Sequence, residues 1–277
     1  MSEHRFHFIT GLPRSGSTLF SAILRQNPRF SAEMSGPVYG LLTGIIEKQN
    51  PRAEFSHFFT ADKRKNVYRG ILQNYYADEE KPVVFDTSRA WSGQMPLLAN
   101  LFPSSKMIAC VRDIPWIVDS FERLHQKNFL TPSLMGNYSP HGSVYTRANA
   151  WTGPEGIIGF PFDLLKQAYF GEYSDRLLIL PYDSLVQNPA VMMAKVHQFL
   201  GEPTFDYDFN NLVYRADEFD SLSGVPELHQ VRRKVEFQPR STLLPPDLFQ
   251  RLHNQFGWLK PGETGALGPK SRSTLLG

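Results

Sequence analysis

One glycine-bounded loop, between a strand pattern and a helix pattern, constrains the fold of this chain more than any other feature. Residues 4–10 alternate in the manner of a strand, and the run that begins at Ser17 carries apolar residues at helical spacing. The loop between them, residues 11–18, reads GLPRSGST. A strand, a tight turn and a helix in this order predict the opening unit of an α/β protein.

Three later segments repeat the order of a strand followed by a helix. Short, almost continuously apolar runs, which are typical of buried parallel strands, stand at residues 82–86, 106–111 and 176–181. Helical spacing follows at residues 95–102, 114–126 and 190–200. This alternation predicts an α/β fold with a parallel β-sheet flanked by helices. The GxxxxG spacing of the loop at residues 11–18 makes a P-loop-type sheet the expected form. Ligands of such sheets bind beyond the carboxyl ends of the strands.

Length and composition indicate one main domain. The chain has 277 residues, of which 41% are hydrophobic, and this is enough to bury one large core. We expect a single domain over residues 1–261. The stretch 262–277 has too few large apolar residues to fold alone, so we expect a flexible C-terminal tail there.

Charge and cysteine content exclude several kinds of function. Lysine plus arginine exceed aspartate plus glutamate by only two, so no overall positive field would hold the protein on nucleic acid or on an acidic membrane. Any anion must therefore be bound by a local cluster of cations. Cys110 is the only cysteine, which excludes a disulfide framework and a cysteine-rich metal site.

The first ten residues bear on the cellular location. They are charged and then alternate, unlike a signal peptide, and no stretch of the chain approaches the roughly 20 apolar residues of a membrane span. We therefore expect a soluble, cytoplasmic protein without a membrane span. The sequence leaves the oligomeric state open.

The glycine-bounded loop has the GxxxxG spacing of a phosphate-binding loop, but Ser17 stands where nucleoside-triphosphate enzymes place lysine. Backbone N–H groups of such a turn, together with the positive end of the following helix, favour a phosphate or a sulfate. The nearby cation is Arg14, inside the loop itself. Without the lysine that reaches the β and γ phosphates, the predicted ligand is not ATP with magnesium.

The run GLPRSGSTLF resembles the 5′-phosphosulfate loop of sulfotransferases that use 3′-phosphoadenosine-5′-phosphosulfate (PAPS). The bacterial and protein-tyrosine branches of that family carry similar runs. The resemblance implies a sulfotransferase fold, PAPS as co-substrate, and transfer of the sulfuryl group to a hydroxyl or amine. It also implies that Arg14 offsets charge on the bridging oxygen. The residues expected to wrap the 5′-phosphosulfate are Arg14, Ser15, Gly16, Ser17 and Thr18.

A second motif follows the apolar run at 106–111. Arg112 stands at the predicted strand end, and Ser120 lies two turns into the following helix, so both can converge on one anion. This spacing resembles the family's 3′-phosphate motif, which implies that Arg112 and Ser120 bind the 3′-phosphate of PAPS. Taken alone, Arg112 could instead form a strand-end salt bridge with Asp113.

Arg89 is a candidate catalytic cation. Many sulfotransferases carry a lysine after the second strand, and Thr87 occupies that place here. Arg89, two positions further on, has the charge and the reach to donate to the sulfuryl group and its leaving oxygen. The alternative is a solvated arginine at the start of a helix.

Acceptor activation needs a general base. Relatives of the protein-tyrosine sulfotransferases place a catalytic glutamate shortly after the helix that follows the loop, and Glu33 lies close to that place, although slightly early. The resemblance therefore makes Glu33 the first choice. His125, His141 and Asp86 are alternatives. The chemistry needs no metal, and the eight histidines show no spacing typical of a zinc site.

Two further regions are candidates for the site. The densest basic patch contains Arg232, Arg233, Lys234 and Arg240, in a region where many sulfotransferases close a basic loop over the 3′-phosphate. The alternative is an exposed cationic stretch. Residues 128–162, rich in Gly, Pro, Ser and aromatic residues, are predicted to be irregular or weakly helical and to form the acceptor pocket. Tyr182 is predicted to support the sheet. Aromatic residues that could line a pocket or fill the core are Trp91, Trp116, Trp151, Tyr138, Tyr145 and Phe160.

The acceptor class stays open: a small molecule, a glycan, a lipid or a peptide is each compatible with the sequence, and nucleic acid is not expected. Two other functions also fit the predicted fold. One is a P-loop nucleotide kinase or NTPase, which Ser17 in place of lysine argues against. The other is a non-catalytic PAPS-binding protein that has kept the nucleotide site and lost its base.

Overall fold

The computed structural model describes residues 4–49, 56–127, 142–214, 220 and 229–257. Its centre is a five-stranded sheet with the order β2-β3-β1-β4-β5, in which each neighbouring pair is parallel. The parallel α/β fold predicted from the sequence is therefore confirmed. The strands are β1 (Arg5–Gly11), β2 (Phe30–Ala32), β3 (Val83–Thr87), β4 (Met107–Val111) and β5 (Leu177–Pro181).

Helices flank the sheet and connect its strands. The α-helices are α1 (Ser17–Leu24), α2 (Val38–Lys48), α3 (Ala61–Tyr75), α4 (Met95–Leu101), α5 (Ile114–Lys127), α6 (Val144–Thr152), α7 (Gly159–Phe170), α8 (Tyr182–Gln187), α9 (Pro189–Leu200) and α11 (Pro246–Gln255). The 3₁₀ turns are η1 (Ser56–Phe58), η2 (Trp91–Gln94) and η3 (Ser174–Arg176). The segment 142–162, predicted to be irregular or weakly helical, contains α6 and the start of α7. Residues 128–141 and the predicted tail 262–277 lie outside the described residues.

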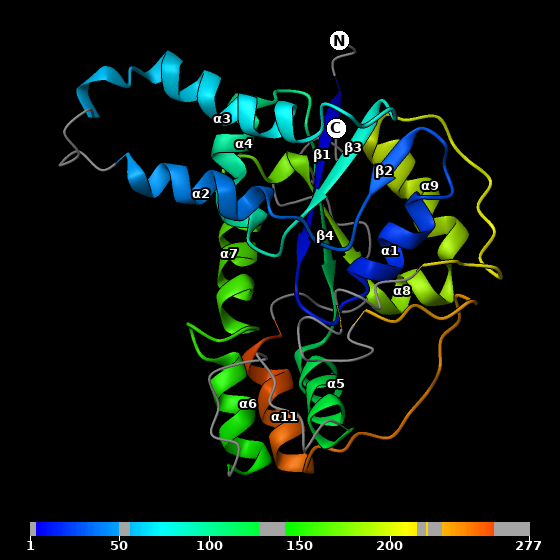
Figure 1. The fold of residues 1–277 in the computed structure, drawn as a ribbon. Coiled ribbons are helices and arrows are strands. Elements are labelled where there is room, and N and C mark those ends of the chain that lie inside the picture. The colour runs from blue at the N-terminus through cyan, green and yellow to red at the C-terminus, as the bar shows by residue number, and fades with distance from the viewer. Residues whose placement is uncertain (1–3, 50–55, 128–141, 215–219, 221–228, 258–277) are drawn as a thin grey trace, which may run out of the picture.

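Two clusters of buried apolar residues lie on the two faces of the sheet. On one face, α1, α8 and α9 cover strand residues such as Ile9; on the other, α4 and α7 cover residues such as Phe8 (Figure 1). Neighbouring residues of a strand point to opposite faces, so β1 contributes to both clusters. Trp91 and Trp151 are almost completely buried in the Phe8 cluster, where they act as core rather than as pocket lining.

The carboxyl ends of the strands carry the loops that matter for function. The strands are parallel, so the loops after β1, β3, β4 and β5 meet at one edge of the sheet. Beyond that edge α5 packs against both α6 and α11, which brings the C-terminal helix beside the loop region (Figure 1). No helix of the described residues has both the length and the apolarity that a membrane crossing requires.

Gly11 is expected to contribute strongly to the stability of the fold. Its φ is +116°, and a Cβ at this position would lie 2.1 Å from the carbonyl oxygen of Cys110. We expect Gly11→Ala to lower the free energy of unfolding by about 3 kcal/mol, because neither backbone can move without breaking the sheet. Gly201→Ala is the matched control, since Gly201 also has a left-handed φ of +73° but open space around it. The control should cost only about 1 kcal/mol. Equal urea midpoints for the two variants would contradict this.

Candidate active site

A cavity of about 880 Å³ opens at the carboxyl edge of the sheet. Its walls come from the loops after β1, β2, β3 and β4, from α8, and from residues 155–161 and 229–240. Segments far apart in the sequence therefore meet around one space, as parallel α/β sheets generally allow. The size is that of sites that bind cofactors or small molecules.

The loop after β1 offers unused backbone donors to this cavity. Arg14 and Gly16 both adopt left-handed conformations, with φ values of 57° and 86°. Turns of this kind aim neighbouring N–H groups at one point. Within the described residues, no backbone carbonyl outside the helices and strands accepts from the amides of residues 16–18, and no side chain caps α1. The start of α1 therefore has the features of an anion site.

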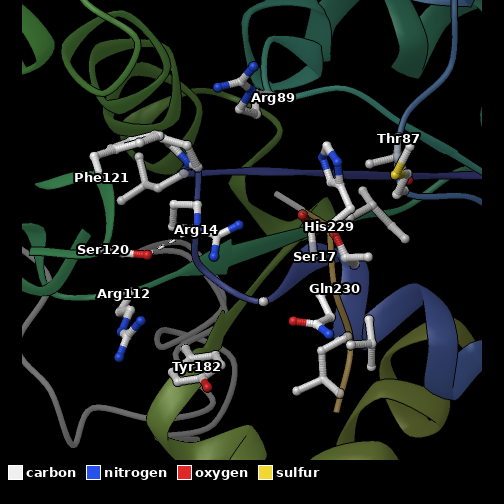
Figure 2. Close-up of a pocket in the computed structure, with 18 of the residues that line it drawn as sticks. Arg14, Ser17, Thr87, Arg89, Arg112, Ser120, Phe121, Tyr182, His229 and Gln230 are labelled. Carbon is white, nitrogen blue, oxygen red and sulfur yellow. Dashed lines mark hydrogen bonds between the residues drawn. The ribbon is translucent and has the colours of Figure 1, made fainter. Parts of the chain in front are cut away.

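Arg14 and Ser120 meet at this loop. The Nε of Arg14 donates to the hydroxyl of Ser120 at 3.1 Å (Figure 2). Burial, followed by the nearby charge of Arg112, lowers the pKa of Arg14 to about 10. Two guanidinium groups that repel one another at the floor of a cavity favour an anion between or beside them. The structure thus brings the two predicted phosphate motifs into one space.

Tyr182 links the two motifs, a role beyond the sheet support predicted from the sequence. The Cζ of Arg112 lies 4.4 Å from the centre of the Tyr182 ring. On the other side, a Cβ added to Gly16 would come within 2.7 Å of the ring's Cδ2. Glycine at position 16 therefore makes room for the ring that positions Arg112. No sequence spacing indicates this contact, because Tyr182 comes from a distant strand end.

Arg112 is available to a ligand rather than paired with Asp113. Its Nε is buried without a hydrogen-bond partner, and among the described residues Asp113 contacts His253 instead, with 2.9 Å between Oδ2 and Nδ1. A buried donor that lacks a partner is costly, so such groups often mark a site that a ligand completes. The alternative of an Arg112–Asp113 salt bridge is not what the structure contains.

The cavity is strongly cationic although the whole chain is nearly neutral. Its lining includes six lysine or arginine residues and two glutamates: Arg14, Arg89, Arg112, Arg232, Lys234, Arg240, Glu155 and Glu236. Of the predicted basic patch, Arg233 lies outside this lining and donates to Oδ1 of Asn211 at 2.8 Å. The local cluster of cations that an anionic ligand requires is therefore present.

Glu33, the first choice as general base, is placed away from the cavity lining. Its side chain is 59% exposed and forms an ion pair of 2.9 Å with Arg25. Only its backbone contributes to the site, because its carbonyl oxygen accepts from Thr87 Oγ1 at 2.7 Å. An exposed carboxylate that pairs with Arg25 at the end of α1, outside the cavity lining, is poorly placed to take a proton inside the cavity.

Of the alternative bases, Asp86 and His125 do not line the cavity. Asp86 is fully buried and accepts from Tyr76 Oη and Trp91 Nε1, both at 2.6 Å. Burial raises the pKa of its carboxyl group. Asp86 thus fixes the turn after β3 rather than facing a substrate. His125 lies outside the lining, and His141 lies outside the described residues.

A histidine that the sequence analysis did not single out does reach the cavity. His229 lines it (Figure 2). The ring Nδ1 lies 2.5 Å from Oδ1 of the buried Asp220. The backbone N–H of His229 also donates to Asp220 Oδ2 at 2.8 Å. The charge of Asp220 offsets part of the lowering that burial and Arg112 impose on the pKa of Arg14, so the pair acts on the loop electrostatically. Because the carboxylate holds the proton on Nδ1, Nε2 is the nitrogen that can accept one.

Arg89 also lines the cavity, but on another side. Figure 2 shows it across the space from Arg112 and Tyr182. Its side chain is exposed to the cavity although protein surrounds it, and burial lowers its pKa. The structure therefore does not group Arg89 with the cations around Arg14.

A model of the sulfotransferase family matches residues 7–206, more than half of the chain. The chain belongs to the sulfotransferase family. This sulfotransferase also matches solved structures in fold. The sulfotransferase domain from the curacin biosynthetic pathway is 18% identical, with a TM-score of 0.54, over 94% of this chain and 99% of that one. A sulfotransferase from Alicyclobacillus acidocaldarius is 15% identical, with a TM-score of 0.51, over 93% and 92%. No curated protein sequence matches the chain.

The family assignment confirms the resemblance seen in the loop of residues 11–18. Both the loop and the second motif at Arg112 lie inside the matched range of this sulfotransferase, whereas His229 and the basic residues after 231 lie beyond it. The matched part therefore carries both predicted anion-binding motifs. The residues after 206 supply one wall of the cavity and the histidine.

Proposed function

We propose that this sulfotransferase transfers the sulfuryl group of PAPS to a hydroxyl or amine acceptor and releases adenosine 3′,5′-bisphosphate. The observation that carries the proposal is the meeting of two anion-binding motifs in one cationic cavity. The open amides of residues 16–18 suit the 5′-phosphosulfate, and Arg112 with Ser120 suits the 3′-phosphate. A nucleotide with phosphates at both ends of its ribose fits such a pair of sites.

Different residues of the cavity serve different parts of an in-line transfer. The acceptor oxygen forms a bond to sulfur while the bond between sulfur and the bridging oxygen breaks, and the bridging oxygen keeps the electron pair. Arg14 and the amides of the loop are placed to stabilise the charge that develops there. Nε2 of His229 takes the proton of the acceptor, and Asp220 stabilises the imidazolium that results.

In this proposal Thr87 helps to position the loop after β2. Its hydroxyl donates to the backbone carbonyl of Glu33 and thereby joins the loop after β2 to the end of β3. The proposed general base is His229 in place of Glu33, because His229 lines the cavity and Glu33 does not. Arg232 and Arg240, which also line it, are placed to add positive charge around the nucleotide.

The test is transfer from ³⁵S-labelled PAPS to pooled phenols, sugars, lipids and peptides, with release of adenosine 3′,5′-bisphosphate measured in parallel. We expect labelled product from at least one pool, and the same rate with EDTA present. Phosphate transfer from ATP, with none of sulfur from PAPS, would instead identify a nucleotide kinase. Bisphosphate binding without any turnover would identify a non-catalytic PAPS-binding protein.

A further inference from the structure

Arg89 is set apart from the other cations of the cavity. Among the described residues the Arg89 guanidinium forms no ion pair or hydrogen bond, and this includes Glu155 of the same cavity. Burial alone lowers its pKa, whereas the pKa of Arg14 responds to several charged neighbours. Figure 2 shows Arg89 on the side of the space that faces away from Arg112 and Tyr182. A guanidinium that faces the cavity and has no partner in the described part of the protein is available to an anionic group of a ligand.

The backbone around Arg89 is held rigidly. The carbonyl oxygen of Arg89 accepts a hydrogen bond from Thr10 Oγ1 at 2.9 Å. Two residues later, the indole N–H of Trp91 donates a hydrogen bond to Asp86. The Trp91 side chain is completely buried. Arg89 therefore projects from an ordered turn between β3 and η2. Binding an anion at such a side chain costs little ordering of the backbone.

The walls next to this turn are apolar. Helix α7 packs against η2, and Gly93 of η2 is so close to Leu164 that a Cβ there would lie 2.9 Å from Cδ2. Ile157, just before α7, and Phe160, in its first turn, line the cavity, and Phe160 is 44% exposed. Exposed aromatic surface inside a concave site favours an apolar ligand.

We propose that Arg89 binds a carboxylate on the acceptor, so that the enzyme acts on apolar hydroxy acids. This inference rests on the proposed function, because the two phosphate sites of the nucleotide leave Arg89 for the other substrate. A single guanidinium without further cations around it matches the planar carboxylate better than a phosphate dianion, which usually gathers several donors. Arg89 is then a specificity residue rather than the partner of the leaving oxygen expected from the sequence.

The experiment measures acceptor binding to the protein saturated with adenosine 3′,5′-bisphosphate. The probes are 3-hydroxydecanoate and 3-(4-hydroxyphenyl)propanoate, each compared by calorimetry with its methyl ester. We expect at least one acid to bind about tenfold or more tightly than its ester, because the acid alone forms charge-assisted hydrogen bonds. Arg89→Met should remove this difference, and Arg89→Lys should restore part of it.

Lys166→Met is the matched control, because it removes one positive charge from an exposed position of α7 that does not line the cavity. It should keep the preference for the acid. Equal binding of acid and ester by the unchanged protein, or a preference that survives in Arg89→Met, would overturn the proposal. Failure of adenosine 3′,5′-bisphosphate to bind in the first step would instead count against the proposed function.

Discussion

Replacing His229 with glutamine is expected to lower kcat for sulfuryl transfer by about 10²- to 10⁴-fold, the usual contribution of a general base. Glutamine keeps the size of the side chain and can still donate a hydrogen bond to Asp220, which lies 2.5 Å from the histidine ring. It cannot take the acceptor's proton. The affinity for adenosine 3′,5′-bisphosphate should be unchanged, because the nucleotide sites do not involve Nε2.

Two further variants sharpen this test. Asp220→Asn should lower kcat less than His229→Gln, since the asparagine still contacts the ring but no longer stabilises its charged form. Glu33→Gln should leave kcat unchanged, because the Glu33 side chain is exposed and paired with Arg25. A normal kcat in His229→Gln, or a large loss in Glu33→Gln, would show that the base is misassigned.

The second large effect is expected at Arg112. We expect Arg112→Met to weaken binding of adenosine 3′,5′-bisphosphate by about 100-fold, because a buried, charge-assisted contact to the 3′-phosphate is lost. Adenosine 5′-monophosphate, which lacks that phosphate, should bind both proteins with similar affinity. The comparison of the two nucleotides isolates the 3′-phosphate from any general change in the cavity. Calorimetry on the same preparations supplies the four dissociation constants.

Arg233→Met is the control for this prediction. Arg233 belongs to the same predicted basic patch as Arg232, but its guanidinium contacts Asn211 outside the cavity lining. Its loss should change the affinity for adenosine 3′,5′-bisphosphate little, as expected for a solvent-exposed cation at a distance. Equal losses in Arg112→Met and Arg233→Met would mean that only the general positive field matters.

The fold could be predicted because its signals are local. The apolar runs of β3, β4 and β5, and the loop between β1 and α1, each show their structure within a few consecutive residues. The sequence analysis predicted neither helix α2 nor helix α3. Helix α3 is mostly polar and buries only a narrow stripe that includes Leu72, and α2 buries Val38 and Leu42 but leaves Leu41 exposed. A weak stripe of this kind is hard to distinguish from a loop.

The candidate site could be predicted only where a motif lies on one strand end and the element that follows it. Arg14 and Ser120 were both assigned to phosphate binding from such motifs, and the structure brings them within 3.1 Å. Glu33 was assigned from its distance along the chain, which does not indicate that its exposed side chain pairs with Arg25 outside the cavity lining. The His229–Asp220 pair had no sequence signal, since it forms only when the chain returns over the sheet.

The central claim is that the cavity binds a nucleotide with phosphates at both its 3′ and 5′ ends and does so without a metal. Titration calorimetry in EDTA with adenosine 3′,5′-bisphosphate, compared with ATP in magnesium, tests it most directly. We predict one site per chain for the bisphosphate, with an affinity that magnesium does not change, and weak or no binding of ATP. Tight, magnesium-dependent binding of ATP together with no heat from the bisphosphate would contradict the account.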